Sequence, residues 1–175
     1  INSILEMQPL PEAEHSKKPK DNSVELSEVS FRYKDADRNA LNDISLTIKA
    51  GEHVAFVGPS GGGKTTLASI VARFWDVTGG SVKVGGVNVK DISKEELMDT
   101  VSFVFQDSRL LKISILDNVR MAKPDASREE VLKTLHDAQC DDILEKLPRG
   151  ADTVIGTKGV YLSGGEQQRI AIARA

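Results

Sequence analysis

Gly58-Pro59-Ser60-Gly61-Gly62-Gly63-Lys64-Thr65 fits the phosphate-binding pattern G-x-x-x-x-G-K-[ST], and the prediction of the fold rests on it. The apolar run before it, residues 53–57 (HVAFV), predicts a buried strand. After it, apolar side chains recur at helical spacing and predict a helix whose buried face is formed by Leu67, Ile70, Val71 and Phe74. The pattern therefore lies between a strand and a helix, which is the context that a phosphate-binding loop needs.

The chemistry of this loop follows from its residue types. Glycines adopt backbone angles that other residues resist, so that amide N–H groups close around phosphate oxygens at the positive end of a helix. Lys64 is expected to reach the β- and γ-phosphates, and the Thr65 hydroxyl is expected to ligate Mg2+. The competing interpretation is a glycine-rich turn with a chance lysine, and the flanking strand and helix disfavour it.

Composition and charge narrow the class of protein. Apolar residues make up 39% of the 175 residues and charged residues 28%, which suits a globular protein and excludes neither an enzyme nor a binding module. The net charge of -3 argues against bulk attraction to nucleic acid. No run approaches the roughly 18 apolar residues of a membrane span. Because the sequence starts at Ile1 and stops at Ala175 inside an apolar helical pattern, we expect a fragment of a longer protein.

The rest of the chain divides into a strand-rich part and a helical part. Residues 1–22, with several prolines and mixed charges, predict a linker. Alternating apolar residues predict strands at 24–31 and 44–48, and glycine pairs predict a hairpin with strands at 81–84 and 87–89. A buried strand is also expected at 101–105.

Helix signals dominate the second half of the sequence. Ser93 and Glu96 have the spacing of a capping box and predict a short helix. Residues 114–147 are expected to be helical, with a second capping-box spacing at Ser127 and Glu130. We therefore expect a mainly helical unit after an α/β unit.

A second glycine-containing motif, LSGGEQQR, occupies residues 162–169 before a helix predicted at 167–175. Ser163 and Glu166 again have capping-box spacing, so one interpretation is a well-capped helix. The other is an anion site, because small residues at a helix N-terminus leave its N–H groups accessible. The motif on its own does not distinguish a capped helix from an anion site.

The order GPSGGGKT, VFQD with Gln106, and LSGGEQQRIAIARA resembles the nucleotide-binding domain of an ABC transporter ATPase, over residues 24–175. The resemblance implies an α/β fold: a P-loop NTPase (RecA-like) core with an antiparallel β subdomain and a helical subdomain at about 108–165, incomplete at the C-terminus. It implies that residues 1–22 are a linker from a preceding membrane domain and that residues 23–175 form the ABC ATP-binding domain.

Site roles follow from the same resemblance. Tyr33 is similar to the aromatic residue that stacks on adenine, Lys64 and Gln106 to catalytic residues, and Thr65 and Gln106 to the Mg2+ ligands. The ATP-binding set implied for the first motif is Gly58, Pro59, Ser60, Gly61, Gly62, Gly63, Lys64, Thr65 and Thr66. A further set contacts the ATP of a second ATP-binding domain in a head-to-tail dimer, homomeric or heteromeric, and comprises Ser163, Gly164, Gly165 and Glu166.

Two features resemble the exporter-type subgroup, in which membrane and ATPase domains share one chain. One is the linker, and the other is residues 153–159, which are similar to the segment TxVGExG. Thr157 replaces the usual glutamate of that segment, which puts in doubt a contact to the membrane domain. Glu166 replaces the glutamine usual in exporters, and we expect it to turn back and cap its own helix.

The function implied is an ATPase that couples ATP binding and hydrolysis to transport, at the cytoplasmic face of the membrane, with a transmembrane domain as partner and no nucleic acid. The family's catalytic carboxylate follows the signature motif and is absent from these residues, so we expect the fragment alone to be inactive. The alternatives are a non-transport ABC ATPase and a degenerate regulatory nucleotide-binding partner.

Overall fold

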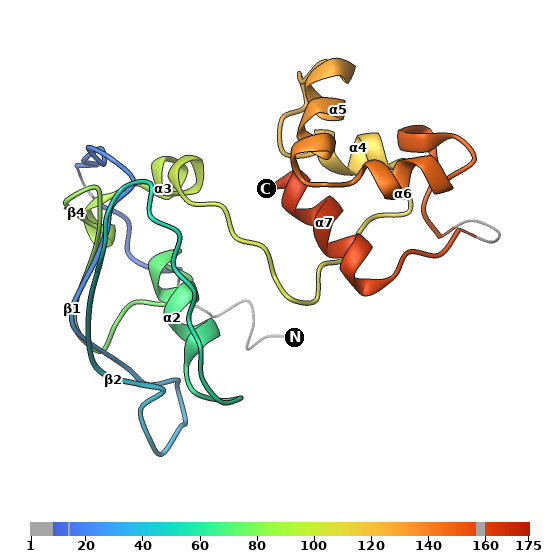
Figure 1. The fold of residues 1–175 in the computed structure, drawn as a ribbon. Coiled ribbons are helices and arrows are strands. Elements are labelled where there is room, and N and C mark those ends of the chain that lie inside the picture. The colour runs from blue at the N-terminus through green and yellow to red at the C-terminus, as the bar shows by residue number, and fades with distance from the viewer. Residues whose placement is uncertain (1–8, 14, 157–159) are drawn as a thin grey trace. The chain divides into compact units, whose positions relative to one another are not determined.

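The computed structural model describes residues 9–13, 15–156 and 160–175, which divide into two compact units (Figure 1). The first unit runs to Ser102 and the second begins at Phe103. The first eight residues of the predicted linker and the departure at Thr157 lie outside the described residues. No helix among the described residues has the length and apolar character needed to cross a membrane.

The first unit is built on an antiparallel sheet. In the described residues its strands are β1 (Val24–Phe31), β2 (Leu41–Ile48), β3 (Gly79–Val84) and β4 (Val87–Asn88), in the order β2-β1-β3-β4. These strands confirm the predictions made for this region, including the hairpin of β3 and β4. The apolar alternation of β1 changes phase between Leu26 and Val29. The pairing of β1 with β2 has a register shift at this point, where Glu28 has a φ of 51°.

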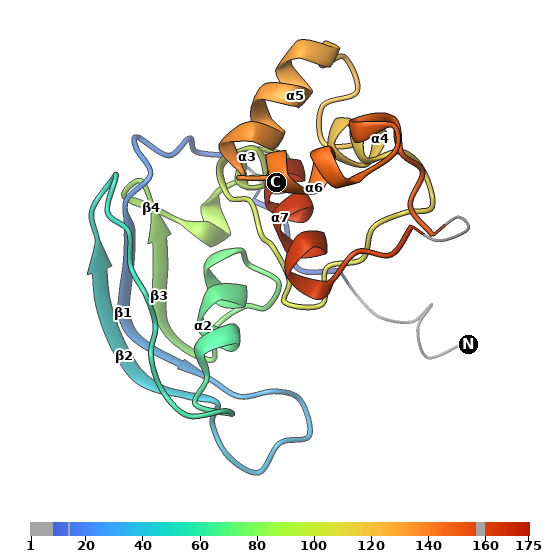
Figure 2. The same ribbon diagram turned by 45° about the vertical axis from the view of Figure 1, so that its right-hand side comes forward.

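Helices α2 (Lys64–Val71) and α3 (Lys94–Thr100) complete this unit, with the short 3-10 helix η1 (Val89–Asp91) before α3. Figure 2 shows α2 lying along one face of the sheet, beside β3. The core at this face is formed by apolar side chains that the alternation of the strands and the spacing of the helix bring together, among them Leu26, Val29, Phe31, Leu67, Ile70, Val82 and Val84. The α3 helix begins as predicted, because the Ser93 hydroxyl accepts the Glu96 N–H.

Two predicted strands are wrong. Residues 53–57 and 101–105 form no strand, and in the first of these runs Val54, Phe56 and Val57 are 47%, 40% and 94% exposed. A strand of a parallel core becomes buried only when neighbouring strands satisfy its backbone groups and cover both faces. The sheet of the described residues is antiparallel throughout and contains no partner for either run.

The predicted end of the buried helix face is also wrong. Helix α2 ends at Val71, and Arg73 then adopts a φ of 52°, which turns the chain out of the helix. Phe74 consequently lies beyond the helix with 42% of its surface exposed. Leu67 and Ile70 are buried as predicted.

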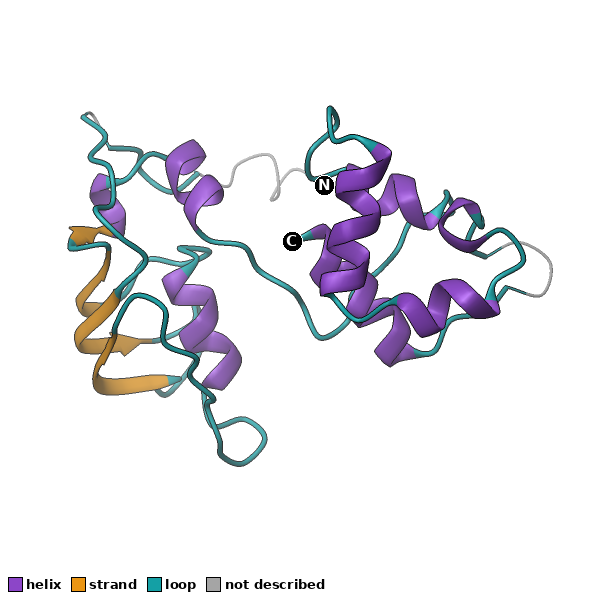
Figure 3. Ribbon diagram, turned by 45° about the horizontal axis from the view of Figure 1, so that its top comes forward, coloured by secondary structure: helices purple, strands orange, loops and turns teal. Residues whose placement is uncertain are grey.

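The second unit is helical, as predicted for residues 114–147. Its helices in the described residues are α4 (Ile115–Arg120), α5 (Arg128–Asp137), α6 (Asp141–Lys146), the 3-10 helix η2 (Gly150–Asp152) and α7 (Gly164–Arg174) (Figure 3). The capping box of Ser127 and Glu130 is confirmed. The final helix begins at Gly164, three residues before the predicted start. Helix α7 packs on α4 and α5 around a core that includes Ile115, Leu135, Ile143 and Ile170.

Candidate functional site

The phosphate-loop motif forms a tight turn that leads directly into α2. The Gly62 N–H donates to the Pro59 carbonyl at 3.2 Å, and Gly61 and Gly63 have φ values of 77° and 81°. Gly63 is the N-cap of α2, and a Cβ on it would lie 2.7 Å from the Ala40 carbonyl oxygen. Both the backbone angle and the close approach of the chain before β2 therefore require glycine at position 63.

The lysine of the motif folds back over the loop. Lys64 Nζ donates to the carbonyl oxygens of Gly58 and Pro59 at 2.9 and 2.7 Å. The first turn of α2 carries no acidic residue, and its leading N–H groups have no partner within the helix. An ammonium group and a helix N-terminus thus concentrate positive charge at the loop, which is the electrostatic requirement of a phosphate site.

The two threonines after Lys64 differ in their surroundings. Thr65 is exposed, whereas Thr66 is buried and its hydroxyl is 2.9 Å from the Tyr33 hydroxyl. The Thr65 hydroxyl is therefore the accessible one of the pair. The Tyr33 contact joins the end of β1 to the first turn of α2, so the structure brings Tyr33 to the helix that follows the phosphate loop.

Tyr33 belongs to an aromatic cluster with Phe31 and Trp75. Its ring packs edge-on against Phe31, with centroids 4.8 Å apart, and against Trp75, with centroids 5.7 Å apart. Tyr33 and Trp75 are 38% and 45% exposed, so the cluster presents aromatic surface to solvent. Sequence reasoning missed Trp75, although it is the single tryptophan of the chain and lies just after the phosphate-loop helix.

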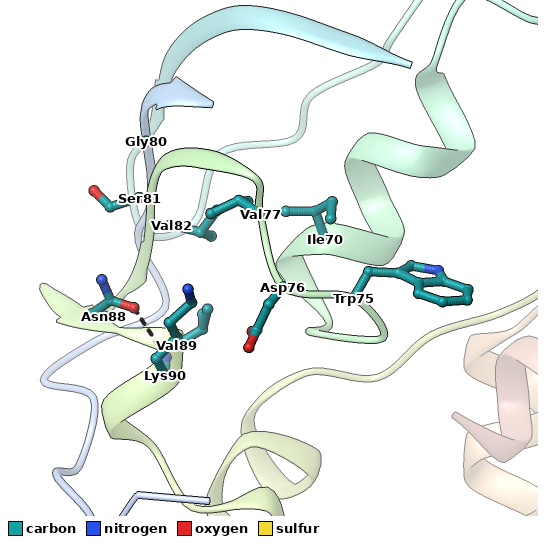
Figure 4. Close-up of a pocket in the computed structure, with 10 residues that line it drawn as sticks. All are labelled: Ile70, Trp75, Asp76, Val77, Gly80, Ser81, Val82, Asn88, Val89 and Lys90. Atoms are coloured by element: carbon teal, nitrogen blue, oxygen red, sulfur yellow. Dashed lines mark hydrogen bonds between the residues drawn. The ribbon is translucent and has the colours of Figure 1, made fainter. Parts of the chain in front are cut away.

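Two cavities adjoin α2, and neither alone encloses a nucleotide. One of about 270 Å3 lies beside Gly62, Gly63 and Lys64, and the remainder of its lining is apolar. The other lies where α2 ends and has a volume of about 40 Å3, with Asp76, Asn88 and Lys90 as its charged or amide side chains (Figure 4). Because ligand cavities usually occupy some 300–1,000 Å3, the second cavity is too small for a nucleotide.

The signature-like motif forms the capped N-terminus of α7. The Ser163 hydroxyl accepts the Glu166 N–H, and Glu166 Oε2 accepts the Ser163 N–H at 2.8 Å and the Ser163 hydroxyl at 2.9 Å. These bonds to Ser163 lower the pKa of Glu166. The expected capping arrangement of Glu166 is confirmed, and Ser163, Gly164 and Gly165 are exposed.

Charged groups on α6 hold the start of α7. The Arg169 guanidinium donates to both carboxylate oxygens of Asp142 at 2.7 and 3.1 Å and also to the Gln139 carbonyl. Its hydrogen bonds lower the pKa of Asp142 to about 2. Lys146 lies 3.8 Å from the Glu166 carboxylate. Sequence reasoning missed this set of residues, because contacts between α6 and α7 join positions far apart in the chain.

The predicted site residues thus fall in two groups. Those of the phosphate loop, with Tyr33, lie in the first unit, and Gln106 and the signature-like motif lie in the second. Gln106 is exposed, in a segment without regular secondary structure. No cluster of His, Cys, Asp and Glu side chains within the described ranges is placed to hold a metal ion.

A glycine-rich loop, its lysine and a helix that starts at that lysine define a P-loop protein. Similarity to known proteins identifies a family within the class of P-loop proteins. The family model described as ABC transporter matches residues 41–175. A "Putative multidrug export ATP-binding/permease protein" of Staphylococcus aureus is 42% identical over 155 residues, which is 89% of this chain and 27% of that protein. A protein of the same description from Bacillus subtilis is 42% identical over 151 residues, covering 86% of this chain and 26% of its own length.

A solved structure agrees with these relatives. The structure of a bacterial Atm1-family ABC exporter with ATP bound superimposes with a TM-score of 0.88 at 35% identity, covering 99% of this chain and 30% of that one. The chain therefore belongs to the ABC transporter family, and it is an ATP-binding domain of the exporter type. It spans about a quarter of the length of the relatives it matches.

Proposed function

We propose that this domain binds ATP with Mg2+ at the phosphate loop. The observation that carries the proposal is the geometry of the loop. The ammonium group of Lys64 donates to the carbonyls of Gly58 and Pro59, and Gly61 and Gly63 have positive φ values. A phosphate group brings oxygens that accept stronger, charge-assisted hydrogen bonds than neutral carbonyls do. Lys64 therefore exchanges the carbonyls of Gly58 and Pro59 for phosphate oxygens when nucleotide binds.

The other residues of the loop have separate roles in this proposal. Mg2+, when bound, would neutralise phosphate charge, and the exposed hydroxyl of Thr65 would hold it. Thr66 contributes its backbone N–H, because its hydroxyl is engaged by Tyr33. The partly exposed Tyr33 ring, supported by Phe31 and Trp75, is the stacking surface for adenine.

The larger function is that of an exporter in which this domain supplies ATP binding. Two copies, or this domain and a related one, pair head to tail, with Ser163, Gly164 and Gly165 contacting the nucleotide of the opposite domain. The exposure of these residues supports such a contact. The domain works at the cytoplasmic face of a membrane, attached to a transmembrane domain, and hydrolysis is coupled to transport in the longer protein. The exporter-type relatives support this assignment.

The test is calorimetric titration of the protein with Mg-ATP. Lys64→Ala removes the charge-assisted hydrogen bonds, worth about 1.5–3 kcal/mol, and is expected to weaken binding by roughly ten- to a hundredfold. Lys49→Ala is the matched control, because Lys49 is an exposed lysine at the end of β2. Equal affinities of the two variants would refute the role given to Lys64.

A further inference from the structure

The chain before β1 is fastened along the first unit. We call its described residues, 9–13 and 15–21, the strap. The Arg73 guanidinium donates to the Pro11 carbonyl at 2.7 Å, and the Ser93 N–H donates to the Ser16 hydroxyl at 2.9 Å. Further along the strap, the Lys17 N–H donates to the Asp91 carbonyl at 2.8 Å, and the Lys20 N–H to the Gly85 carbonyl at 3.1 Å. The strap therefore has backbone contacts along its length and is more than a free linker.

Charge complementarity adds to these contacts. Lys17 Nζ lies 3.1 Å from the Asp91 carboxylate, and Lys18 Nζ lies 3.1 Å from that of Glu96. Exposed ion pairs of this kind contribute little individually. They match basic groups of the strap to acidic groups on η1 and α3, and so favour one alignment of the strap over others.

The turn between β3 and β4 is shaped to let the strap pass. Gly85 is buried with a φ of 55°, and a Cβ there would lie 2.4 Å from the Asp21 carbonyl oxygen and 2.7 Å from the Lys20 nitrogen. The neighbouring Gly86 has a φ of 76°, but a Cβ on it would meet nothing within 4 Å. Both glycines have a positive φ, which disfavours any other residue. Only at Gly85 would an added Cβ also collide with the strap.

Arg73 connects the strap to the phosphate-loop helix. Its side chain is 10% exposed and donates to the Asp76 carboxylate at 3.0 Å and to the Val89 carbonyl at 3.2 Å, in addition to Pro11. Its backbone turns the chain at the end of α2 with a φ that side-chained residues rarely adopt. One guanidinium thus bonds the strap to a strained turn at the end of the helix that begins with Lys64.

The apolar part of the same contact is a cavity of about 240 Å3 between the strap, the turn that follows α2, and α3. Pro9, Leu10 and Pro11 line one side, and Phe74, Leu97 and Met98 line the other. Leu10 and Phe74 are 40% and 42% exposed. In this part of the strap, the hydrogen bond of Arg73 to the Pro11 carbonyl lies beside a cavity rather than beside closely packed side chains.

We propose that the strap is a releasable connection whose docking is linked to nucleotide binding through Arg73, so that the docked strap favours the ATP-bound state. This linkage rests on the ATP binding proposed above. Within α2 the Ser69 hydroxyl donates to the Thr65 carbonyl, and just beyond the end of the helix the Phe74 N–H donates to the Ser69 carbonyl. Ordering of the phosphate loop and ordering of the Arg73 turn therefore stabilise each other, and linkage makes the effect reciprocal.

Amide hydrogen exchange of the intact protein tests the docking. Gly85→Ala is expected to release the strap and to raise exchange at the amides of Lys17, Lys20 and Ser93 at least tenfold. Gly86→Ala is the matched control and is expected to leave these amides as in the parent protein, since its added methyl group meets only open space. Equal exchange in the two variants overturns the docking.

Calorimetric titration with Mg-ATP tests the linkage on the same variants. We expect the Kd of Gly85→Ala to be at least threefold higher than that of Gly86→Ala, and saturating Mg-ATP to slow strap exchange in the parent protein by the same factor. An equal or lower Kd in a variant whose strap exchanges freely overturns the linkage. A parent protein that binds no ATP instead refutes the proposed function, and its exchange data still decide the docking.

A charge swap keeps the proposal testable if Gly85→Ala fails to fold. Lys18→Glu places like charges at the Glu96 contact and is expected to raise exchange at Lys17 and Lys20 about threefold. The double variant Lys18→Glu/Glu96→Lys restores opposite charges and is expected to return exchange to the parent value. Failure of the swap to restore protection overturns the assigned alignment of the strap.

Discussion

The structure predicts that Gly63→Ala damages the phosphate loop more than the chemically identical change Gly61→Ala. Both glycines have positive φ values, 81° and 77°. Holding alanine in this region costs about 1–2 kcal/mol at either position. At position 63 the new Cβ also lies 2.7 Å from the Ala40 carbonyl oxygen and 2.9 Å from Leu41 Cδ2, whereas at position 61 it meets nothing within 4 Å.

The difference in unfolding free energy between the two variants gives the cost of the steric clash at position 63. Overpacking against a backbone carbonyl typically costs about 1–3 kcal/mol, so Gly63→Ala is expected to lose about 2–5 kcal/mol of unfolding free energy and Gly61→Ala about 1–2 kcal/mol. Urea denaturation followed by the fluorescence of Trp75, the single tryptophan, measures this loss in the first unit. The Kd for Mg-ATP, measured by titration, is expected to rise in the same order.

Equal destabilisation by the two variants would refute the reasoning, because it would mean that the approach of Ala40 and Leu41 to the loop has no energetic effect. A larger effect at Gly61 would also refute it. A rise in Kd without a change in stability would indicate that the loop adapts to the methyl group and loses only its phosphate geometry.

Three further predictions concern the second unit. The pKa of Asp142 is lowered from 3.8 to about 2, so its bond to Arg169 stabilises the fold above pH 3.8 and is lost as the pH falls toward 2. Asp142→Asn is therefore expected to reduce the dependence of the unfolding free energy on pH in this range, as measured by acid denaturation followed by circular dichroism. Ser163→Ala removes the cap of α7 and is expected to cost about 1 kcal/mol in urea denaturation, with an unchanged unfolding profile counting against the capping box. Leu135→Ala empties a fully buried position and is expected to cost about 2–5 kcal/mol, whereas a loss below 1 kcal/mol would contradict the assigned core.

The elements that were predicted correctly are those whose signals lie within a few residues. The capping boxes at Ser127 and Ser163, the hairpin turn at Gly85 and Gly86, and the helix beginning at Lys64 all depend on neighbours along the chain. The ABC family assignment depends on such motifs in a given order, and the matching family model confirms it. The roles of Tyr33, Gln106 and the signature residues stay predictions.

The predictions that failed concern features that the spacing of apolar residues does not specify. Residues 53–57 have the composition of a buried strand, but a strand exists only where another strand pairs with it, and the described residues supply none. Phe74 continues the apolar spacing of α2, but the turn at Arg73 ends the helix before it. The spacing of apolar residues indicates which side chains are suited to burial on one helix face. It does not indicate the residue at which the helix ends.

The phosphate-binding loop and the second capped glycine motif can be identified from the amino-acid sequence, because residues at fixed, short spacings specify both. The need for particular residues, and the contacts that they make, follow from the tertiary structure. Gly63 is required by Ala40, Gly85 by the strap, and Arg73 joins the strap to α2. These contacts join segments that are distant in the sequence and meet only after folding. Steric exclusion and hydrogen bonding between such segments depend on their positions in space, which a local sequence pattern does not specify.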